Sequence, residues 1–325
     1  MERTGKTKEY GNAGVEPSGP VVAGSYGTWR LTFEAGAIGV APGGVIRVTT
    51  DSDTDWGMPQ FTDPAAADYM TVEAPPGATA DVQAVDLRTV RAVVRGRGLR
   101  PGERLTLVYG DRSGGGPGSR AQTFLEPRHH FCVDVDPEGT GGLVTLDDSP
   151  WVTVVGGDAV RLVVTAPSDA LVGQPFRVLV KAEDRWGNPA GSYRGAVELS
   201  GDGLELSERV VLFGEAEHGA RWVEGVRPTR TGVLHVHAVD RATGLGGRSN
   251  PVVCRTEAPE HALCWADPHG GQVALNSKIA DFFRYARDVA GLDFVGYQRN
   301  DNLITHEDWR VQQEQEAASY EPGRF

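Results

Sequence analysis

The stretch "TWRLTFEAG", residues 28–36, alternates apolar and polar side chains with a period of two. Its alternating members are Trp29, Arg30, Leu31, Thr32, Phe33 and Glu34. Successive side chains of a β-strand point to opposite faces, so this pattern places one face in a core and the other in water. The stretch predicts a half-buried strand and makes antiparallel β-structure the expected fold class.

Runs of the same kind surround this stretch, and turn residues such as Pro42-Gly43 and Pro101-Gly102 separate them. The runs are "GGVIRVTT" (43–50), "TVRAVVRGRG" (89–98), "RLTLVYGD" (104–111), "HHFCVDVDPEG" (129–139) and "WVTVVGGDAV" (151–160). We therefore predict one antiparallel β-sandwich over residues 20–157. The polar, Gly- and Pro-containing residues 1–19 are predicted to be disordered.

A second set of strands is predicted over residues 158–255, at the spacing expected of an immunoglobulin-like β-sandwich. The strands are "AVRLVVTAPS" (159–168), "PFRVLVKAED" (175–184), "GAVELSGDG" (195–203) and "GVLHVHAVD" (232–240). The segment "EDRWGNPAG" (183–191) resembles the bacterial immunoglobulin-like modules in which a strand ends in an acid, an aromatic residue and Gly-Asn-Pro. That resemblance implies a fold and says almost nothing about activity.

Residues 256–325 follow a different pattern, which predicts a strand–helix–strand unit. "HALCWA" (261–266) and "LDFVGYQ" (292–298) are the expected strands, and "NSKIADFFRYARDVAG" (276–291) is the expected helix. Its predicted buried face consists of Ile279, Phe282, Phe283, Ala286 and Val289. Asn276 or Ser277 is the expected N-cap and Gly291 the left-handed C-cap. A capped, largely polar helix is expected beyond Thr305.

Polar residues follow the two predicted strands of this unit. Asp267 and His269 come directly after the first strand, and Asn300 and Asp301 come after the second. Parallel strands joined by a helix end at the same edge of the sheet, where ligands and catalytic groups gather. A carboxylate and an imidazole at one edge are suited to Zn, Mn or Fe. These four residues are therefore the candidate metal ligands. The alternative is that Asp267 caps a turn and His269 is a solvated loop residue.

The same segment resembles the opening of a PHP-related family of unknown function (polymerase and histidinol phosphatase type). The resemblance lies in "CWADPHGGQ" (264–272) and the helix with its following strand. Its matching residues are Trp265, Asp267, His269, Tyr285, Ala286, Arg287, Asp288, Leu292, Asp293, Phe294 and Trp309. PHP domains are metal-dependent phosphoesterases with a distorted βα barrel. The resemblance thus implies two β-modules followed by the first βαβ portion of such a barrel.

The sequence departs from the PHP pattern at several positions. Gly271 stands where a second histidine is usual, and Gln298-Arg299-Asn300 stands where Thr-Asp-His is usual. An arginine at that place would repel a cation. A barrel of this type needs about 200 residues or more, and only residues 256–325 are available. We therefore expect a truncated PHP-like domain, natural or made by cutting a longer chain, with low metal occupancy.

The composition excludes some partners. A formal net charge of −12 argues against binding to nucleic acid, because the summed field repels polyanions. The N-terminal residues lack the apolar core of a secretory signal, and no apolar run is long enough to span a bilayer. We therefore expect a cytoplasmic protein without a membrane partner. Cys132, Cys254 and Cys264 are expected to be reduced thiols buried as small hydrophobic residues.

Two functions remain open at this point. In the first, the chain is the N-terminal portion of a PHP-type metal-dependent hydrolase and is not active by itself. In the second, it is a non-catalytic binding or scaffolding protein with a relic metal site. The apolar helix face is expected to dock on the second sandwich, combined with weak self-association. The pair His129-His130 is expected in a solvated turn.

Overall fold

The computed structural model describes residues 5–50, 54–270, 279–298 and 304–325. The chain is mainly β and divides into two compact units, Met1–Gly156 and Gly157–Phe325. This division lies next to the boundary between modules that the sequence predicts at residues 157 and 158. Between residues 25 and 250, the described part of the chain contains no helix. None of the described helices is long and apolar enough to cross a membrane.

The first unit contains two main antiparallel sheets. One has the strand order β1-β4-β9-β6, with the bounds Gly11–Glu16, Trp29–Ala35, Arg104–Tyr109 and Met70–Glu73. The other has the order β2-β13-β11-β5-β8-β7, where only the β2–β13 pair is parallel. Its bounds are Val21–Val22, Trp151–Val155, Glu126–Asp136, Val45–Thr50, Thr89–Gly96 and Ala78–Ala84; β12 (Val144–Thr145) also pairs with β11. Two short strands, β3 (Tyr26–Gly27) and β10 (Ser119–Arg120), form a separate pair.

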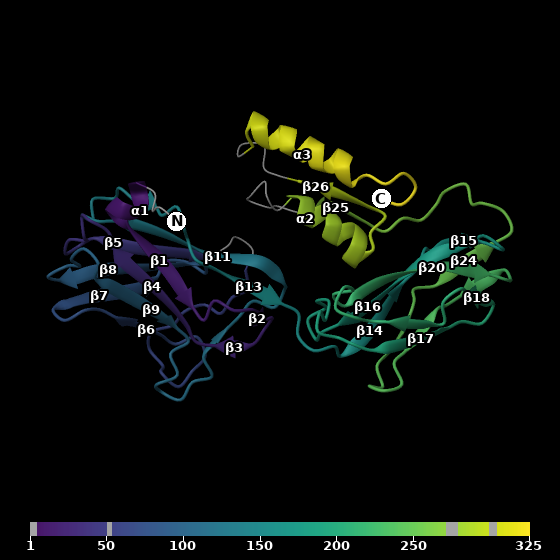
Figure 1. Ribbon diagram of the computed structural model, residues 1–325, viewed down its shortest axis with the longest axis horizontal. Helices are drawn as coiled ribbons and strands as arrows, with labels where there is room; N and C mark the ends of the chain where they lie inside the picture. The colour runs from purple at the N-terminus through teal and green to yellow at the C-terminus, as the bar shows by residue number, and fades with distance from the viewer. Residues whose placement is uncertain (1–4, 51–53, 271–278, 299–303) are drawn as a thin grey trace. The chain divides into compact units, whose positions relative to one another are not determined.

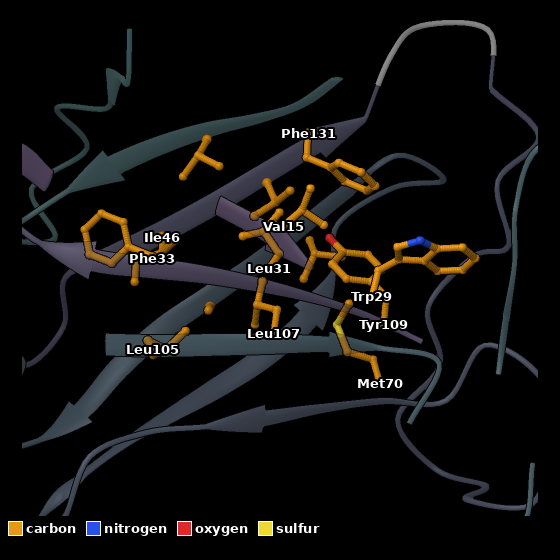
Figure 2. Close-up of a cluster of buried hydrophobic side chains, with 14 of the residues drawn as sticks. Val15, Trp29, Leu31, Phe33, Ile46, Met70, Leu105, Leu107, Tyr109 and Phe131 are labelled. Atoms are coloured by element: carbon orange, nitrogen blue, oxygen red, sulfur yellow. The ribbon is translucent and has the colours of Figure 1, made fainter. Parts of the chain in front are cut away.

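Side chains from both sheets form the core of the first unit. The alternation in β4 is realised, because Trp29, Leu31 and Phe33 are buried while Arg30 is exposed. Figure 2 shows these three side chains among buried residues of β5, β9 and β11. Their partners include Ile46, Leu105, Leu107, Tyr109 and Phe131. Burying each large apolar side chain stabilises the fold by about 1.5–3 kcal/mol.

The N-terminal segment differs from the prediction of disorder over residues 1–19. Residues Gly5–Tyr10 form the helix α1, and β1 pairs with β4 in antiparallel register from Gly11–Ala35 to Glu16–Arg30. The buried side chain of Val15 joins the core. The prediction was wrong for residues 11–16 because the hydrogen-bonding edge of β4 stabilises a strand that has little β-propensity of its own.

The second unit begins with three sheets around a second core. Their orders are β14-β16-β20-β18, β15-β24-β21 and β19-β17-β22-β23. The bounds of the first sheet are Arg161–Thr165, Phe176–Glu183, Ala220–Pro228 and Leu204–Leu206. Those of the second are Asp169–Leu171, Val252–Arg255 and Gly232–Leu234, and those of the third are Val210–Leu212, Ala196–Ser200, His237–Val239 and Gly246–Arg248. The single strand predicted at 232–240 is therefore two strands, β21 and β22, in different sheets.

The remainder of the second unit is the predicted strand–helix–strand segment. Strand β25 (Ala266–Gly270) is parallel to β26 (Phe294–Tyr297), and the helix α2 (Ile279–Arg284) continues into the π-helical turn η2 (Tyr285–Ala290) between them. Helix α3 (His306–Ser319) follows, and Figure 1 shows it beside these strands. The described residues show two strands of this sheet, and the expected PHP-like barrel is not shown.

The apolar face of the helix is covered within the second unit. Ile279 and Phe283 pack with Tyr297 of β26, while η2 contacts β20. Gly291 adopts the left-handed conformation predicted for the C-cap, with φ 73°. A Cβ atom at this glycine would lie 3.0 Å from Cδ2 of Leu179 in β16. The segment thus contacts the second β-rich core through η2 and Gly291. The prediction that the apolar face itself docks there was wrong for Ile279 and Phe283, because β26 and α3 cover them within the same segment.

The cysteines only partly follow the sequence prediction. Cys254 is buried, whereas Cys132 and Cys264 are exposed. Burial raises the pKa of the Cys254 thiol above its ordinary value, which disfavours the reactive thiolate. The expectation of three buried thiols was wrong for Cys132 and Cys264. The side chain of Cys132 alternates with the inward-facing residues of β11.

Candidate metal site on the β25 and β26 strands

Asp267 and His269 lie within β25, whereas the sequence places them directly after the first strand of the unit. The predicted strand at 261–266 was wrong, since β25 begins only at Ala266. The apolar residues Leu263 and Trp265 are 60% and 45% exposed. Backbone pairing with β26 begins at residue 266. This pairing, and not the local apolar pattern, determines where the strand starts.

A bulge in β25 brings Asp267 and His269 together. Asp267 pairs with Val295 and Gly270 pairs with Tyr297, so three steps along β25 match two steps along β26. The backbone N–H of His269 donates to Oδ1 of Asp267 at 3.1 Å. Both side chains are exposed. The bulge therefore places the Asp267 carboxylate next to the backbone of His269, on an exposed part of the strand.

Two glycines permit the close backbone packing of this bulge. A Cβ atom at Gly296 of β26 would lie 2.7 Å from the carbonyl oxygen of Pro268. At Gly270 it would lie 2.9 Å from Oδ2 of Asp267 and 3.0 Å from Cζ of Phe282. Gln298 also stabilises the bulge, because its Nε2 donates a hydrogen bond to the carbonyl oxygen of Pro268 at 3.1 Å. The sequence alone gave no sign of the close packing at Gly296.

A second carboxylate, Asp293, anchors the start of β25. Its Oδ2 accepts a 2.7 Å hydrogen bond from the backbone N–H of Trp265, and its own backbone N–H donates to Trp265 O at 2.8 Å. Apart from its place among the residues of the PHP resemblance, Asp293 has no role that the sequence predicts. The reciprocal bonds fix the relative position of the two strands where the pairing begins.

The other candidate ligands, Asn300 and Asp301, lie outside the described residues, as do Gly271 and Arg299. In the described ranges, no group of three or more His, Cys, Asp or Glu side chains is arranged to hold a metal ion. Of the four predicted ligands, the structure thus brings together Asp267 and His269. A carboxylate oxygen and an imidazole nitrogen suit Zn, Mn or Fe, but a catalytic zinc normally has three protein ligands.

The histidine pair in the first unit is not in a solvated turn, contrary to the sequence prediction. His129 lies in β11 and is fully buried. Its ring stacks on Trp56, with the ring centroids 4.9 Å apart and an interplanar angle of 9°. Its Nδ1 lies 3.1 Å from Oε2 of Glu126. The prediction failed because β11 begins at Glu126, so the pair belongs to the strand and not to the turn before it.

Comparison with known proteins shows distant relatives without an assigned activity. No protein-family model matches the chain. Uncharacterized proteins of Chlamydia muridarum (strain MoPn / Nigg) and Chlamydia trachomatis serovar D are each 25% identical, over 294 and 304 residues. Each match covers 84% of this chain and 46% of the relative. The chain therefore spans about half the length of the curated relatives it matches.

Solved structures give low overall similarity. β-Glucuronidase 3 of Bacteroides uniformis is 11% identical with a TM-score of 0.25, covering 74% of this chain and 24% of that protein. The β-glucuronidase of Parabacteroides merdae, also 11% identical, has a TM-score of 0.24 over 73% of this chain and 24% of its own. A chimeric titin Z1Z2 is 12% identical with a TM-score of 0.18, covering 75% of this chain and 94% of its own.

Proposed function

We propose that this chain is part of a metal-dependent hydrolase of the PHP phosphoesterase type. In this proposal both β-rich units are immunoglobulin-like sandwich modules, and β25, α2 and β26 begin the hydrolase domain. Asp267 and His269 would bind the metal, and Asn300 or Asp301 would complete its coordination. A bound Zn, Mn or Fe ion would act as a Lewis acid and generate hydroxide near neutral pH.

The observation that supports this proposal most is the parallel pairing of β25 with β26 through a helical connection. The carboxyl ends of two such strands lie at one edge of the sheet, where ligands bind in α/β folds. His269 is the penultimate residue of β25 at that end, and Asp267 lies two residues before it, where the bulge begins. Asn300 follows the last residue of β26 by three positions, which is short enough for its side chain to approach the same edge.

The residues of this chain would have distinct roles around the metal. The carboxylate of Asp267 would supply negative charge, while its bond to the His269 amide fixes the direction of one oxygen. The His269 imidazole is exposed and would coordinate as the neutral base. Gly296 and Gly270 would hold the bulge in shape. Because two donors do not complete a catalytic site, we expect the chain by itself to lack hydrolase activity.

The second candidate is a non-catalytic binding or scaffolding protein with a relic metal site. It is favoured by the sequence at two positions, Gly271 and Arg299, where the PHP pattern has a histidine and an acid. In that case the β-modules would carry the function. The two candidates differ in whether the edge formed by β25 and β26 retains a divalent ion.

Metal analysis of the untagged protein tests the first candidate. We expect Zn, Mn or Fe at less than one ion per chain, as the low predicted occupancy implies, and loss of most of it in His269→Ala and in Asp267→Asn. Asp267→Asn keeps an oxygen that can accept the His269 N–H bond, so the bulge should survive. His261→Ala removes an exposed histidine of the preceding loop and serves as the matched control. Equal metal content in all four proteins would exclude this site.

A further inference from the structure

A cavity of about 540 Å³ lies in the second unit between the β15 and β24 strands and the linker that precedes β25. Its walls include Asp169, Pro251, Val253, Arg255, Leu263 and Trp265. This volume falls in the range of small-molecule sites, about 300–1,000 Å³. The lining is also of that kind, with apolar side chains around a few polar groups.

Arg255 is the guanidinium group of this cavity, whose lining also includes the imidazole of His261, and most of the hydrogen-bonding capacity of Arg255 is unused. Its Nε donates to Oδ1 of Asp169 over a long distance of 3.4 Å. Its terminal amino groups, Nη1 and Nη2, have no hydrogen-bond partner among the residues that the structure describes. A guanidinium held through Nε presents two parallel N–H donors, which matches the two oxygens of a carboxylate.

The apolar walls face the cavity from two sides. Pro251 and Val253 belong to the β24 region, while Leu263 and Trp265 belong to the linker. Leu263 and Trp265 are large apolar side chains that remain 60% and 45% exposed. An apolar group placed between these walls would remove that surface from water, which favours binding.

We propose that this cavity binds a small organic monocarboxylate with an aromatic or branched aliphatic body. The carboxylate would bind Nη1 and Nη2 of Arg255, and the body would lie against Val253, Leu263 and Trp265. A monoanion fits better than a phosphate dianion, because Asp169 already offsets the charge of the single arginine. This inference does not depend on metal binding at Asp267 and His269.

The test is a titration of the full chain, in the presence of EDTA, with phenylbutyrate and with its neutral amide. Binding is followed by calorimetry and by the indole N–H signals in NMR spectra. We expect the acid to bind at least about tenfold more tightly than the amide, because a charged hydrogen-bond pair is lost in the amide. The indole signal that shifts should be the one missing in Trp265→Phe.

Two arginine variants complete the test. Arg255→Met should weaken acid binding at least about tenfold and bring it level with the amide. Arg230→Met, which removes an exposed arginine paired with Asp202 in the same unit, should leave both affinities unchanged. Equal binding of acid and amide to the unmodified chain would overturn the proposal without any variant. Undiminished acid binding to Arg255→Met, or no binding of either probe at about 10 mM, would do so as well.

Discussion

At the residue scale, Asp184 is a strongly held carboxylate of the second unit. It is buried and accepts hydrogen bonds from the backbone N–H groups of Gly157, Trp186 and Asn188 at 2.8–2.9 Å. The side-chain amide of Asn188 donates a fourth bond at 2.9 Å. Burial acts to raise the pKa of Asp184, but these hydrogen bonds outweigh it and hold the pKa below its ordinary value.

The first prediction follows from this environment. Asp184→Asn should destabilise the second unit by about 1–3 kcal/mol near neutral pH, because donors would face a side chain with one oxygen fewer. A carboxyl with a lowered folded-state pKa contributes stability above its unfolded pKa of about 3.9. That contribution is lost as the pH falls through the folded pKa. The unmodified chain should therefore lose more stability below about pH 4 than Asp184→Asn does.

Urea unfolding at a series of pH values checks this prediction. Asp202→Asn is the control, because the Asp202 side chain is 92% exposed. Its substitution should change the free energy of unfolding by less than about 0.5 kcal/mol. If the free energy of unfolding falls equally at acidic pH in the unmodified chain and in Asp184→Asn, the hydrogen bonds of Asp184 do not favour its ionised form.

At the element scale, the helix between β25 and β26 shows where sequence reasoning holds and where it stops. The period of 3.6 correctly predicts burial of Ile279, Phe283 and Ala286. Val289 is only partly buried, because the π-helical turn η2 adds a residue to the turn and shifts the following side chains. A hydrophobic pattern gives the face of a regular helix, but it does not give the point where the winding changes.

The second prediction concerns the end of this helix. Gly291→Ala should destabilise the docked helix by about 2–4 kcal/mol, from the positive φ and from the approach of the new Cβ to Leu179. Gly244→Ala is matched in φ, at 76°, but its Cβ would meet nothing within 4 Å. It should cost about 1–2 kcal/mol, from backbone strain alone.

Hydrogen exchange distinguishes the two effects. Amides of residues 279–290 should exchange faster in Gly291→Ala and at an unchanged rate in Gly244→Ala. If both variants leave this segment equally protected, the contact between Gly291 and Leu179 does not hold the helix in place. Weak self-association stays a prediction, and a concentration series of the same exchange measurement would reveal it.

At the scale of the whole molecule, the division into two units predicts two unfolding events. Leu107 lies in the core of the first unit and Leu234 in that of the second, and both are 1% exposed or less. Substituting either with alanine should cost about 2–5 kcal/mol. In scanning calorimetry, Leu107→Ala should lower only one transition and Leu234→Ala only the other. A single transition that moves in both variants would contradict independent units.

The sequence predicted the β-rich organisation because strong alternation, as in β4, survives in any packing that buries one face. It did not predict β1 or the start of β25, where the partner strand and not the local pattern fixes the pairing. The candidate site was predicted in part: Asp267 and His269 are adjacent, but the bulge that joins them depends on Gly296 packing against Pro268. Such a contact between residues distant in sequence leaves no local signal.

We propose above that the edge formed by β25 and β26 binds a divalent metal through Asp267 and His269. Paramagnetic broadening by Mn²⁺ tests it most directly in the isotope-labelled chain. At low Mn²⁺, the amide signals of Asp267, His269, Gly270 and Tyr297 should broaden first, and His269→Ala should abolish this effect. Broadening that begins at other acidic surfaces, or that is unchanged in His269→Ala, would contradict the claim.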